Sequence, residues 1–181
     1  MERPTCIREM RVSVETIGEA VLERDVRVAA RDIQEVLADG DLRVDEPFAL
    51  HYEVTRSRDT LHVSVDLTGE VHTTCARCLA PMVHCVDLHI ASDFVPAPPD
   101  MAGDLEAQRT SADTGYYRRD IHLGGYICSE LVLSLPYIYV CSESCKGMCP
   151  RCGANLNEGP CGCVETVDPR LEVLGRLRTT R

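Results

Sequence analysis

The sequence predicts an α+β fold in which an antiparallel β-sheet, or a partly open β-barrel, is combined with a few helices and a C-terminal cysteine-rich module. Three observations lead to this prediction. Alternating apolar and polar residues run through 48–55 and 61–72, on either side of a short polar turn. Segments 30–39 and 120–135 carry apolar residues at helical spacing. Six of the eleven cysteines fall within the stretch 141–163.

The N-terminal part is expected to contain two short strands and one helix. Residues from Met10 to Thr16 alternate in polarity, as a half-buried strand does, and Val26 and Val28 indicate another strand. The helix is expected to span 30–39, with Gly40 as its C-cap. Its apolar face consists of Ile33, Val36 and Leu37.

The middle of the chain predicts three antiparallel strands. Phe48–Thr55 and Leu61–His72 form a hairpin around the turn 56–59. A third strand is expected at 82–90, and the turn before it contains Cys75-x-x-Cys78. A Cys-x-x-Cys between two strands is typical of a metal knuckle, whereas a redox Cys-x-x-Cys needs a helix N-terminus that lowers the pKa of its thiol.

A segment rich in Pro, Ala and Asp, from Pro96 to Gly115, interrupts this pattern and is expected to be a flexible insert. The chain is therefore expected to have three parts. These are a β domain with the Cys-x-x-Cys knuckle at 1–95, a linker at 96–119, and a helix with the cysteine module and a C-terminal helix at 120–181.

The third part is expected to begin and end with a helix. The first starts at Asp120 and ends at Pro136, and Gly124-Gly125 weakens its first turns. The second has Asp168 as N-cap and Pro169 at its first position. Its apolar residues at helical spacing are Leu171, Leu174 and Leu177.

The cysteine stretch has the spacing C-x3-C-x3-C-x2-C-x8-C-x-C. Thiols at this density, in a chain whose first ten residues show no export signal, indicate metal–thiolate bonds rather than disulfides. At its centre, Cys149-Pro-Arg-Cys152-Gly153 has the form of a zinc knuckle. Zinc requires four such ligands at about 2.3 Å in a tetrahedron. The module is therefore expected to be zinc-ribbon-like.

Eight cysteines form four close pairs, enough for two structural zinc ions. The preferred grouping combines Cys149 and Cys152 with the pair at 161 and 163. The second group would then link the pair at 75 and 78 to the pair at 141 and 145. The alternative is a single site with the other thiols free. The predicted metal ligands are Cys75, Cys78, Cys141, Cys145, Cys149, Cys152, Cys161 and Cys163, which leaves Cys6, Cys85 and Cys128 outside.

Composition limits the function. A net charge of −10 argues against a generic grip on nucleic acid over the whole surface, although the last twelve residues hold four arginines and one glutamate. The longest apolar run, 131–141, is about half a membrane span. We expect an intracellular protein with no membrane partner.

No catalytic set stands out in the sequence. The six histidines are scattered, and none has a partner at ligand spacing. A catalytic zinc keeps an open water position and usually a carboxylate base nearby, whereas the thiols here are numerous enough for closed all-cysteine sites. We therefore expect no enzyme activity and no small-molecule substrate.

Several motifs, in this order, are similar to those of one family. They are C-x-R-C-L at Cys75–Leu79, LSLP at Leu133–Pro136, CKGMCPRCGANLN at Cys145–Asn157, C-x-C at Cys161–Cys163, and DPRLEVLGRL at Asp168–Leu177. Together they resemble the YceD-like proteins, the large ribosomal RNA subunit accumulation protein family, over most of the chain. Arg77 matches the motif arginine, and Met148 stands where the family often has Leu.

The resemblance implies a role in accumulation of large-subunit, 23S-type ribosomal RNA, and so in ribosome biogenesis in bacteria and plastids. For this chain we expect a location in the bacterial cytoplasm. The family motifs include no obvious catalytic residues, and the resemblance leaves the biochemical step open.

Three hypotheses follow. The first is a non-enzymatic, zinc-stabilised factor that binds pre-ribosomal RNA, or a ribosomal or assembly protein on it. The basic residues expected to contact phosphate are Arg77, Lys146, Arg151, Arg176 and Arg178. The second is a protein-binding adaptor without RNA contact, whose acidic surface meets basic ribosomal proteins. The third is a thiol redox sensor that uses Cys149 and Cys152.

Overall fold

The computed structural model describes residues 6–18, 20–38, 40–99 and 114–163. The chain divides into two compact units. The sheet unit comprises residues 1–74 and 81–139, and the cysteine unit comprises 75–80 and 140–181. The Cys-x-x-Cys turn thus groups with the distant cysteine stretch. The three-part division expected from composition stays a prediction.

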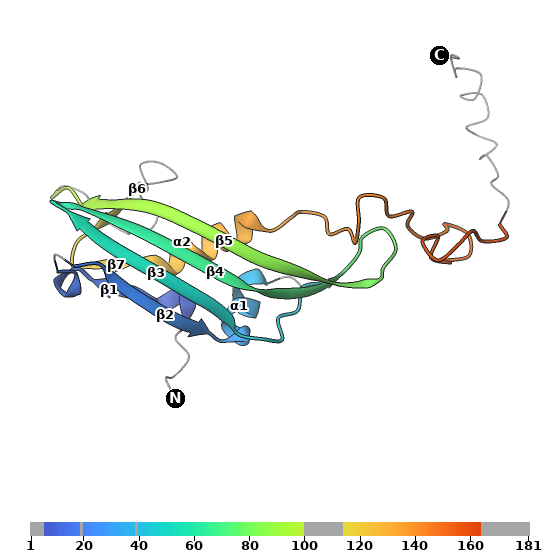
Figure 1. Cartoon of the computed structure of the whole chain (residues 1–181), viewed down its shortest axis with the longest axis horizontal. Coiled ribbons are helices and arrows are strands. Elements are labelled where there is room, and N and C mark those ends of the chain that lie inside the picture. The colour runs from blue at the N-terminus through green and yellow to red at the C-terminus, as the bar shows by residue number, and fades with distance from the viewer. Residues whose placement is uncertain (1–5, 19, 39, 100–113, 164–181) are drawn as a thin grey trace, which may run out of the picture. The chain divides into compact units, whose positions relative to one another are not determined.

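The sheet unit is built on a five-stranded sheet with the strand order β2-β3-β4-β5-β6 (Figure 1). Its strands are β2 (Leu22–Val28), β3 (Phe48–Ser57), β4 (Thr60–Thr74), β5 (Pro81–Pro96) and β6 (Thr114–Tyr117). All neighbours are antiparallel except β5 and β6, which are parallel. The predicted α+β class is confirmed, and within the described residues the sheet is open rather than a closed barrel.

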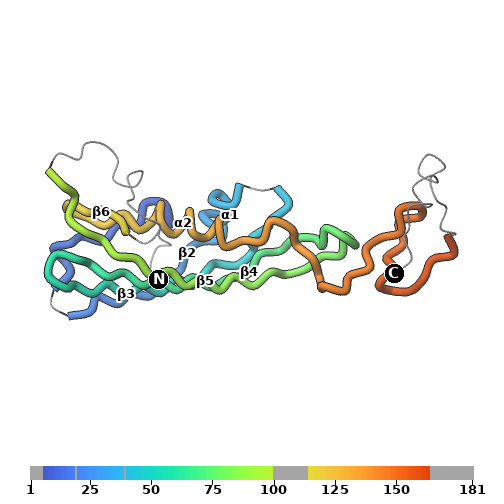
Figure 2. The backbone as a smooth tube through the Cα atoms, turned by 90° about the horizontal axis from the view of Figure 1, so that it is seen from above, coloured from blue at the N-terminus to red at the C-terminus, as the bar shows by residue number. Residues whose placement is uncertain are grey.

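A second, two-stranded sheet pairs β1 (Arg11–Ser13) with β7 (Asp120–His122). Two helices, α1 (Ala30–Leu37) and α2 (Leu123–Ser134), lie on one side of the five-stranded sheet (Figure 2). Short 3-10 turns, η1 (Ile7–Glu9) and η2 (Val14–Thr16), flank β1. The core between the layers contains fully buried Phe48, Leu61, Leu67, Ile121 and Ile127.

The predicted hairpin is confirmed, because β3 and β4 pair from Ala49 with Thr68 to Ser57 with Thr60. The strand predicted at 82–90 is present, but β5 is longer and runs to Pro96. The strand predicted from Met10 to Thr16 is wrong in its second half, where the chain turns into η2.

The C-cap predicted at Gly40 is also wrong. Helix α1 ends at Leu37, and Ala38 takes the left-handed conformation with φ 47°. The chain is then held by Gln34, whose side chain donates to the carbonyl of Leu42 at 2.8 Å and accepts from the N–H of Val44 at 2.9 Å. The helix therefore ends before Gly40.

Helix α2 starts at Leu123 rather than Asp120, because 120–122 pair with β1. The N–H groups of Leu123 and Gly124 donate to the carbonyl of Met10 at 3.1 and 3.0 Å. A Cβ on Gly124 would lie 2.3 Å from the carbonyl oxygen of Ile7. The glycine thus permits close backbone contact at the helix start. No described helix has the length and apolar character needed to span a bilayer. The helix predicted near 168–177 lies outside the described residues.

The contact between Gly69 and Phe48 gives a stability prediction. A Cβ on Gly69 would lie 2.3 Å from Cδ1 of Phe48, whose ring is fully buried. Gly69→Ala must displace the ring, and we expect it to lower the free energy of unfolding by about 1–3 kcal/mol. Urea unfolding measures this, with Ser64→Ala on the same strand as control. Equal stability of the two variants would contradict the close packing.

Candidate metal centres in the cysteine unit

The first candidate centre brings together Cys75, Cys78, Cys141 and Cys145, whose Sγ atoms all lie within 4.8 Å of one another. The Sγ atoms of Cys75 and Cys145 are 3.8 Å apart, and those of Cys78 and Cys141 are 3.7 Å apart. A tetrahedron with zinc–sulfur bonds of about 2.3 Å has edges of about 3.8 Å. Three of the four cysteines are buried, and Cys141 is exposed. The arrangement therefore fits a closed four-thiolate zinc site.

The second candidate centre brings together Cys149, Cys152, Cys161 and Cys163, also with all Sγ atoms within 4.8 Å. Here only Cys149 is buried, while Cys152 and Cys163 are exposed. The structure thus collects the eight cysteines singled out by spacing into the same two groups of four. Each group can hold a metal ion and is compatible with zinc.

The two Cys-x-x-Cys segments adopt the same turn. In the first, the N–H of Cys75 donates to the carbonyl of Ala80 and the N–H of Leu79 donates to the carbonyl of Cys75, at 2.9 and 2.8 Å. In the second, Cys149 donates to Ala154 and Gly153 donates to Cys149, at 2.8 and 2.9 Å.

The residue after the second cysteine has positive φ in both turns, 56° at Leu79 and 72° at Gly153. A left-handed residue at this point reverses the chain, and both sulfurs of the pair then belong to one four-sulfur group. Local sequence therefore builds two equivalent half-sites.

Hydrogen bonds set the ionisation of the sulfurs in the first centre. The backbone N–H of Cys141, with that of Arg77, lowers the pKa of Cys75 to about 6. The side-chain amide of Asn157 donates to Sγ of Cys145 at 3.4 Å and lowers the pKa of that thiol. In contrast, the neighbouring sulfurs of Cys145 and Cys75 raise the pKa of Cys141 to about 12.

The second centre repeats this pattern. The backbone N–H groups of Cys152 and Arg151 lower the pKa of Cys149 to about 6. The sulfurs of Cys152 and Cys149 raise the pKa of Cys163 to about 12. Four thiolates this close repel one another unless a cation lies among them. A zinc ion would supply that positive charge, and its binding at neutral pH would release protons.

The two centres are linked through their backbone. Only three residues separate Cys145 of the first from Cys149 of the second. The N–H of Leu156 donates to the carbonyl of Gly147 at 2.9 Å, and Oδ1 of Asn157 accepts from the N–H of Lys146 at 2.8 Å. The loop between the two ligand pairs of the second centre therefore rests on the ligand turn of the first.

Arg77 is a structural contact within the first centre. Its Nη1 donates to the carbonyls of Glu143 and Cys145 at 3.0 and 3.3 Å. Its own carbonyl accepts from the N–H of Met148 at 3.0 Å. A Cβ on Gly147, whose φ is 74°, would lie 3.0 Å from that same carbonyl oxygen.

Of the other predicted phosphate contacts, Lys146 and Arg151 are exposed in the cysteine unit, as Arg77 is, whereas Arg176 and Arg178 lie outside the described residues. Asn157 and Gly147 were missed by the sequence reasoning. The only signal was their position inside the motif 145–157, where asparagine and glycine are typical of turns.

Arg77 and Arg151 occupy the same position in the two Cys-x-x-Cys turns, and we expect different effects from replacing them. Arg77→Gln removes a charged donor from two carbonyls that position ligands, and should weaken zinc binding by roughly tenfold. Arg151→Gln is the matched control, and should leave the affinity unchanged. Competition with a chromogenic zinc chelator measures both. Equal affinities would contradict the positioning role of Arg77.

The difference in burial predicts unequal exchange at the two centres. A chelator reaches the second centre more easily, because two of its sulfurs are exposed. We expect two kinetic phases of zinc removal, of which Cys161→Ser should abolish the faster. A single phase in the wild type would contradict this expectation.

Comparison with known proteins gives the following matches. Residues 63–178 match the family model described as "Large ribosomal RNA subunit accumulation protein YceD". Uncharacterized proteins of Mycobacterium tuberculosis and Mycobacterium bovis are 34% identical over 105 residues, which is 56% of this chain and 49% of each relative. The chain thus spans about half the length of these relatives.

A chloroplastic protein of Arabidopsis thaliana, named large ribosomal RNA subunit accumulation protein YCED homolog 1, is 38% identical over 61 residues. These are 33% of this chain and 19% of the plant protein. No solved structure gives a significant match.

Proposed function

Because this chain belongs to the YceD family of large ribosomal RNA subunit accumulation proteins, we propose that it is a non-enzymatic, zinc-binding factor of ribosome biogenesis. In this role it supports accumulation of large-subunit, 23S-type ribosomal RNA in the bacterial cytoplasm. It does so by binding the RNA precursor, or a ribosomal or assembly protein carried on it. Two structural zinc ions, one in each four-cysteine group, hold the cysteine unit together.

The observation that carries this proposal is the pair of four-sulfur groups inside the matched region 63–178. Residues 75–80 and 140–163 contain no regular helix or strand in the described part of the chain. Such segments cannot bury enough apolar area to fold unaided, so a metal ion must supply the stabilisation. An all-cysteine site leaves no open position for substrate or water, which favours a binding role over catalysis.

Contact with RNA is the preferred mode of action. Lys146 and Arg151 are exposed on the cysteine unit, next to ligands that fix the backbone, and such residues suit phosphate contacts. Arg176 and Arg178 would add to them. The alternative is an adaptor that binds only protein. A redox sensor based on Cys149 and Cys152 is less well supported, because both sulfurs belong to a four-sulfur group.

The proposal is tested by removing the gene from its host and measuring large-subunit against small-subunit ribosomal RNA. We expect a selective loss of the large-subunit RNA that the wild-type gene restores. A Cys145→Ser gene should not restore it, whereas Cys85→Ser, outside both groups, should. An unchanged RNA ratio in the deletion strain would refute the proposed function. Elemental analysis of the purified protein should give about two zinc ions per chain.

A further inference from the structure

The five-stranded sheet has one face that no described element covers. Helices α1 and α2 lie on the other side, while strands β3, β4 and β5 face the viewer in Figure 1. The strand register places one set of alternating residues on this open face. We name it the acidic face. Its carboxylates are Glu23, Asp25, Glu53, Asp66, Glu70, Asp87 and Asp93, all exposed.

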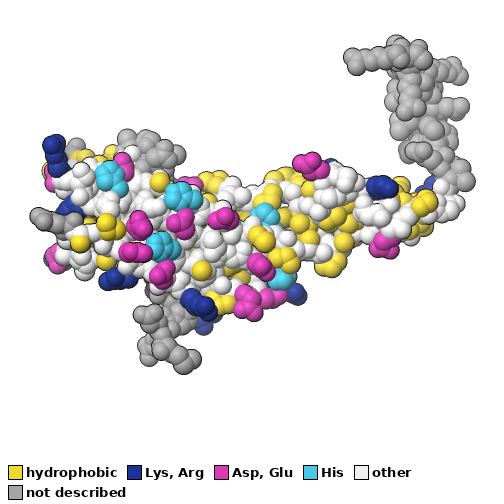
Figure 3. Space-filling view, in the orientation of Figure 1, with side chains coloured by type: hydrophobic (Ala, Val, Ile, Leu, Met, Phe, Trp, Pro, Cys, Tyr) yellow, Lys and Arg dark blue, Asp and Glu magenta, His cyan; other side chains and the backbone are white. Residues whose placement is uncertain are grey.

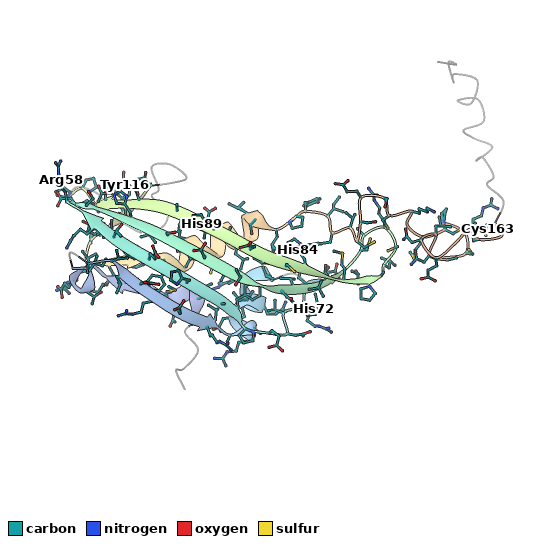
Figure 4. All side chains as sticks on the ribbon, in the orientation of Figure 1. Arg58, His72, His84, His89, Tyr116 and Cys163 are labelled. Carbon is teal, nitrogen blue, oxygen red and sulfur yellow. The ribbon has the colours of Figure 1, made fainter. Side chains whose placement is uncertain are left out.

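The acidic face keeps its negative charge at any physiological pH. Arg27 is the only arginine or lysine among its positions on β2 to β5. Its histidines are His51, His62, His72 and His89. Even with all four imidazoles protonated, seven carboxylates would face only five cations. Figure 3 shows acidic and histidine side chains gathered over these strands, and Figure 4 labels His89 on β5.

The histidines take part in a network of carboxylates. A cross-strand row runs Asp25, His51, Asp66, His89 from β2 to β5. Nδ1 of His51 lies 2.9 Å from Oδ1 of Asp25, and Nδ1 of His89 lies 2.6 Å from Oδ1 of Asp66. The Asp25 carboxylate raises the pKa of His51 above its usual 6.5. Each carboxylate in the row has a second oxygen for another donor.

The face is also hollowed. An open depression of about 1170 Å³ is lined by face residues that include Asp25, Arg27, Ala49, Asp66 and Thr68. His51 lies between the two carboxylates, and the small side chains of Ala49 and Thr68 leave room in the neighbouring cross-strand row. Val26 and Tyr52, which also line the depression, alternate with the face residues and belong to the other side of the sheet, as does Arg24. On the acidic face, a lysine or arginine side chain can pack its alkyl stem against Ala49 and Thr68 while its charged end reaches the Asp66 carboxylate.

We propose that the acidic face docks a lysine- and arginine-rich protein segment in extended conformation. This inference deepens the proposed function and rests on it, since it names a basic protein as the partner. Same-face carboxylates follow one another every two residues along β2 and on adjacent strands about 4.8 Å apart. In an extended peptide with basic residues at every second position, the charged side chains have the same spacing and can each reach a carboxylate of the acidic face. RNA phosphates and a second acidic face would both be repelled.

The test uses the full, zinc-loaded chain and a fluorescent peptide of alternating lysine and threonine, with binding measured by anisotropy. The face variant carries Asp25→Asn, Asp66→Asn and Asp87→Asn. The control carries Glu9→Gln, Glu15→Gln and Glu35→Gln, which are exposed carboxylates outside the acidic face. Both variants change net charge equally. We expect the face variant to bind about tenfold or more weakly, and the control to lose less than about threefold.

Three results would overturn the inference. Equal losses in the two variants would mean that only overall charge attracts the peptide. No binding of the peptide at low salt would remove the docking surface. Weaker binding of a labelled single-stranded RNA by the face variant would assign the face to RNA. Circular dichroism and zinc content must stay at wild-type values, so that misfolding does not imitate a lost contact.

An experiment in cells distinguishes a failure of this inference from a failure of the proposed function. The face variant should fail to restore large-subunit RNA in the deletion strain, whereas the control variant should restore it. Full restoration by the face variant would refute the docking surface and leave the proposed function standing. A deletion strain with no RNA defect would refute the proposed function, while the peptide measurements would still decide whether the face binds a basic segment.

Discussion

Substituting Cys149 with serine is expected to release zinc from the second centre and to unfold the part of the cysteine unit around that centre, while the sheet unit stays folded. The Cys149 side chain is buried among the other three ligands. A serine hydroxyl cannot replace its thiolate, and structural zinc contributes apparent folding free energies of roughly 10–16 kcal/mol in small modules. Elemental analysis should show the loss of about one zinc ion. Amide hydrogen exchange should become fast in 145–163.

The matched control is Cys85→Ser, which changes an exposed thiol on β5 outside both centres. This variant should keep its full zinc content and the wild-type protection of its amides from hydrogen exchange. We also expect the Cys149 variant to weaken the first centre, because the contacts of Leu156 and Asn157 join the two centres. Wild-type protein purified under reducing conditions with no zinc and fully titratable thiols would refute the metal centres altogether.

Local sequence patterns were sufficient to predict much of the fold. The alternation in 48–55 and 61–72 was enough for the hairpin, because side chains on a strand alternate between a buried and an exposed face. The Cys-x-x-Cys turn between β4 and β5 followed from spacing and position. The grouping of its sulfurs with the pair at 141 and 145 rested on counting four ligands per ion. That zinc fills these groups stays a prediction.

Features that depend on distant contacts could not be predicted. Strand β6 pairs in parallel with the end of β5, and β7 pairs with β1 across more than a hundred residues. Neither has enough residues for a periodic signal. Gly124 was interpreted as weakening a helix, whereas it permits contact with the backbone of Ile7. A sequence shows the glycine but does not show what approaches it.

The same limit applies to Arg77. Its positive charge close to the predicted metal ligands suggested a phosphate contact, and the structure shows its guanidinium donating to two backbone carbonyls. Arg151, at the equivalent position, is exposed as Arg77 is. What distinguishes Arg77 is that its two acceptor carbonyls belong to a segment 66 and 68 residues further along the chain. Residue type and spacing near Arg77 do not predict which distant segment packs against it.

If basic side chains of the cysteine unit contact RNA phosphates, the affinity for large-subunit RNA fragments is expected to fall steeply as the salt concentration rises. Each phosphate contact contributes a slope of roughly 0.7–0.9 log units of affinity per log unit of salt. Contacts by Lys146, Arg151, Arg176 and Arg178 would together give a slope of about 3. Replacing all four with glutamine should flatten it, and zinc content should stay constant because none is a ligand. Anisotropy of labelled RNA across a salt series measures this slope.

The control replaces four exposed arginines of the sheet unit with glutamine, at Arg11, Arg24, Arg31 and Arg56. It changes net charge by the same amount, so a general loss of positive charge would flatten both slopes alike. If the phosphate contacts are made only by the four residues Lys146, Arg151, Arg176 and Arg178, the salt dependence flattens in their variant and not in the control. With a net charge of −10, the rest of the surface repels RNA, and non-specific binding should be low. If the wild type shows no salt-sensitive RNA binding and still co-purifies with large-subunit precursors, the basic residues do not contact RNA. The adaptor function, with its protein partner on the acidic face, then replaces RNA binding.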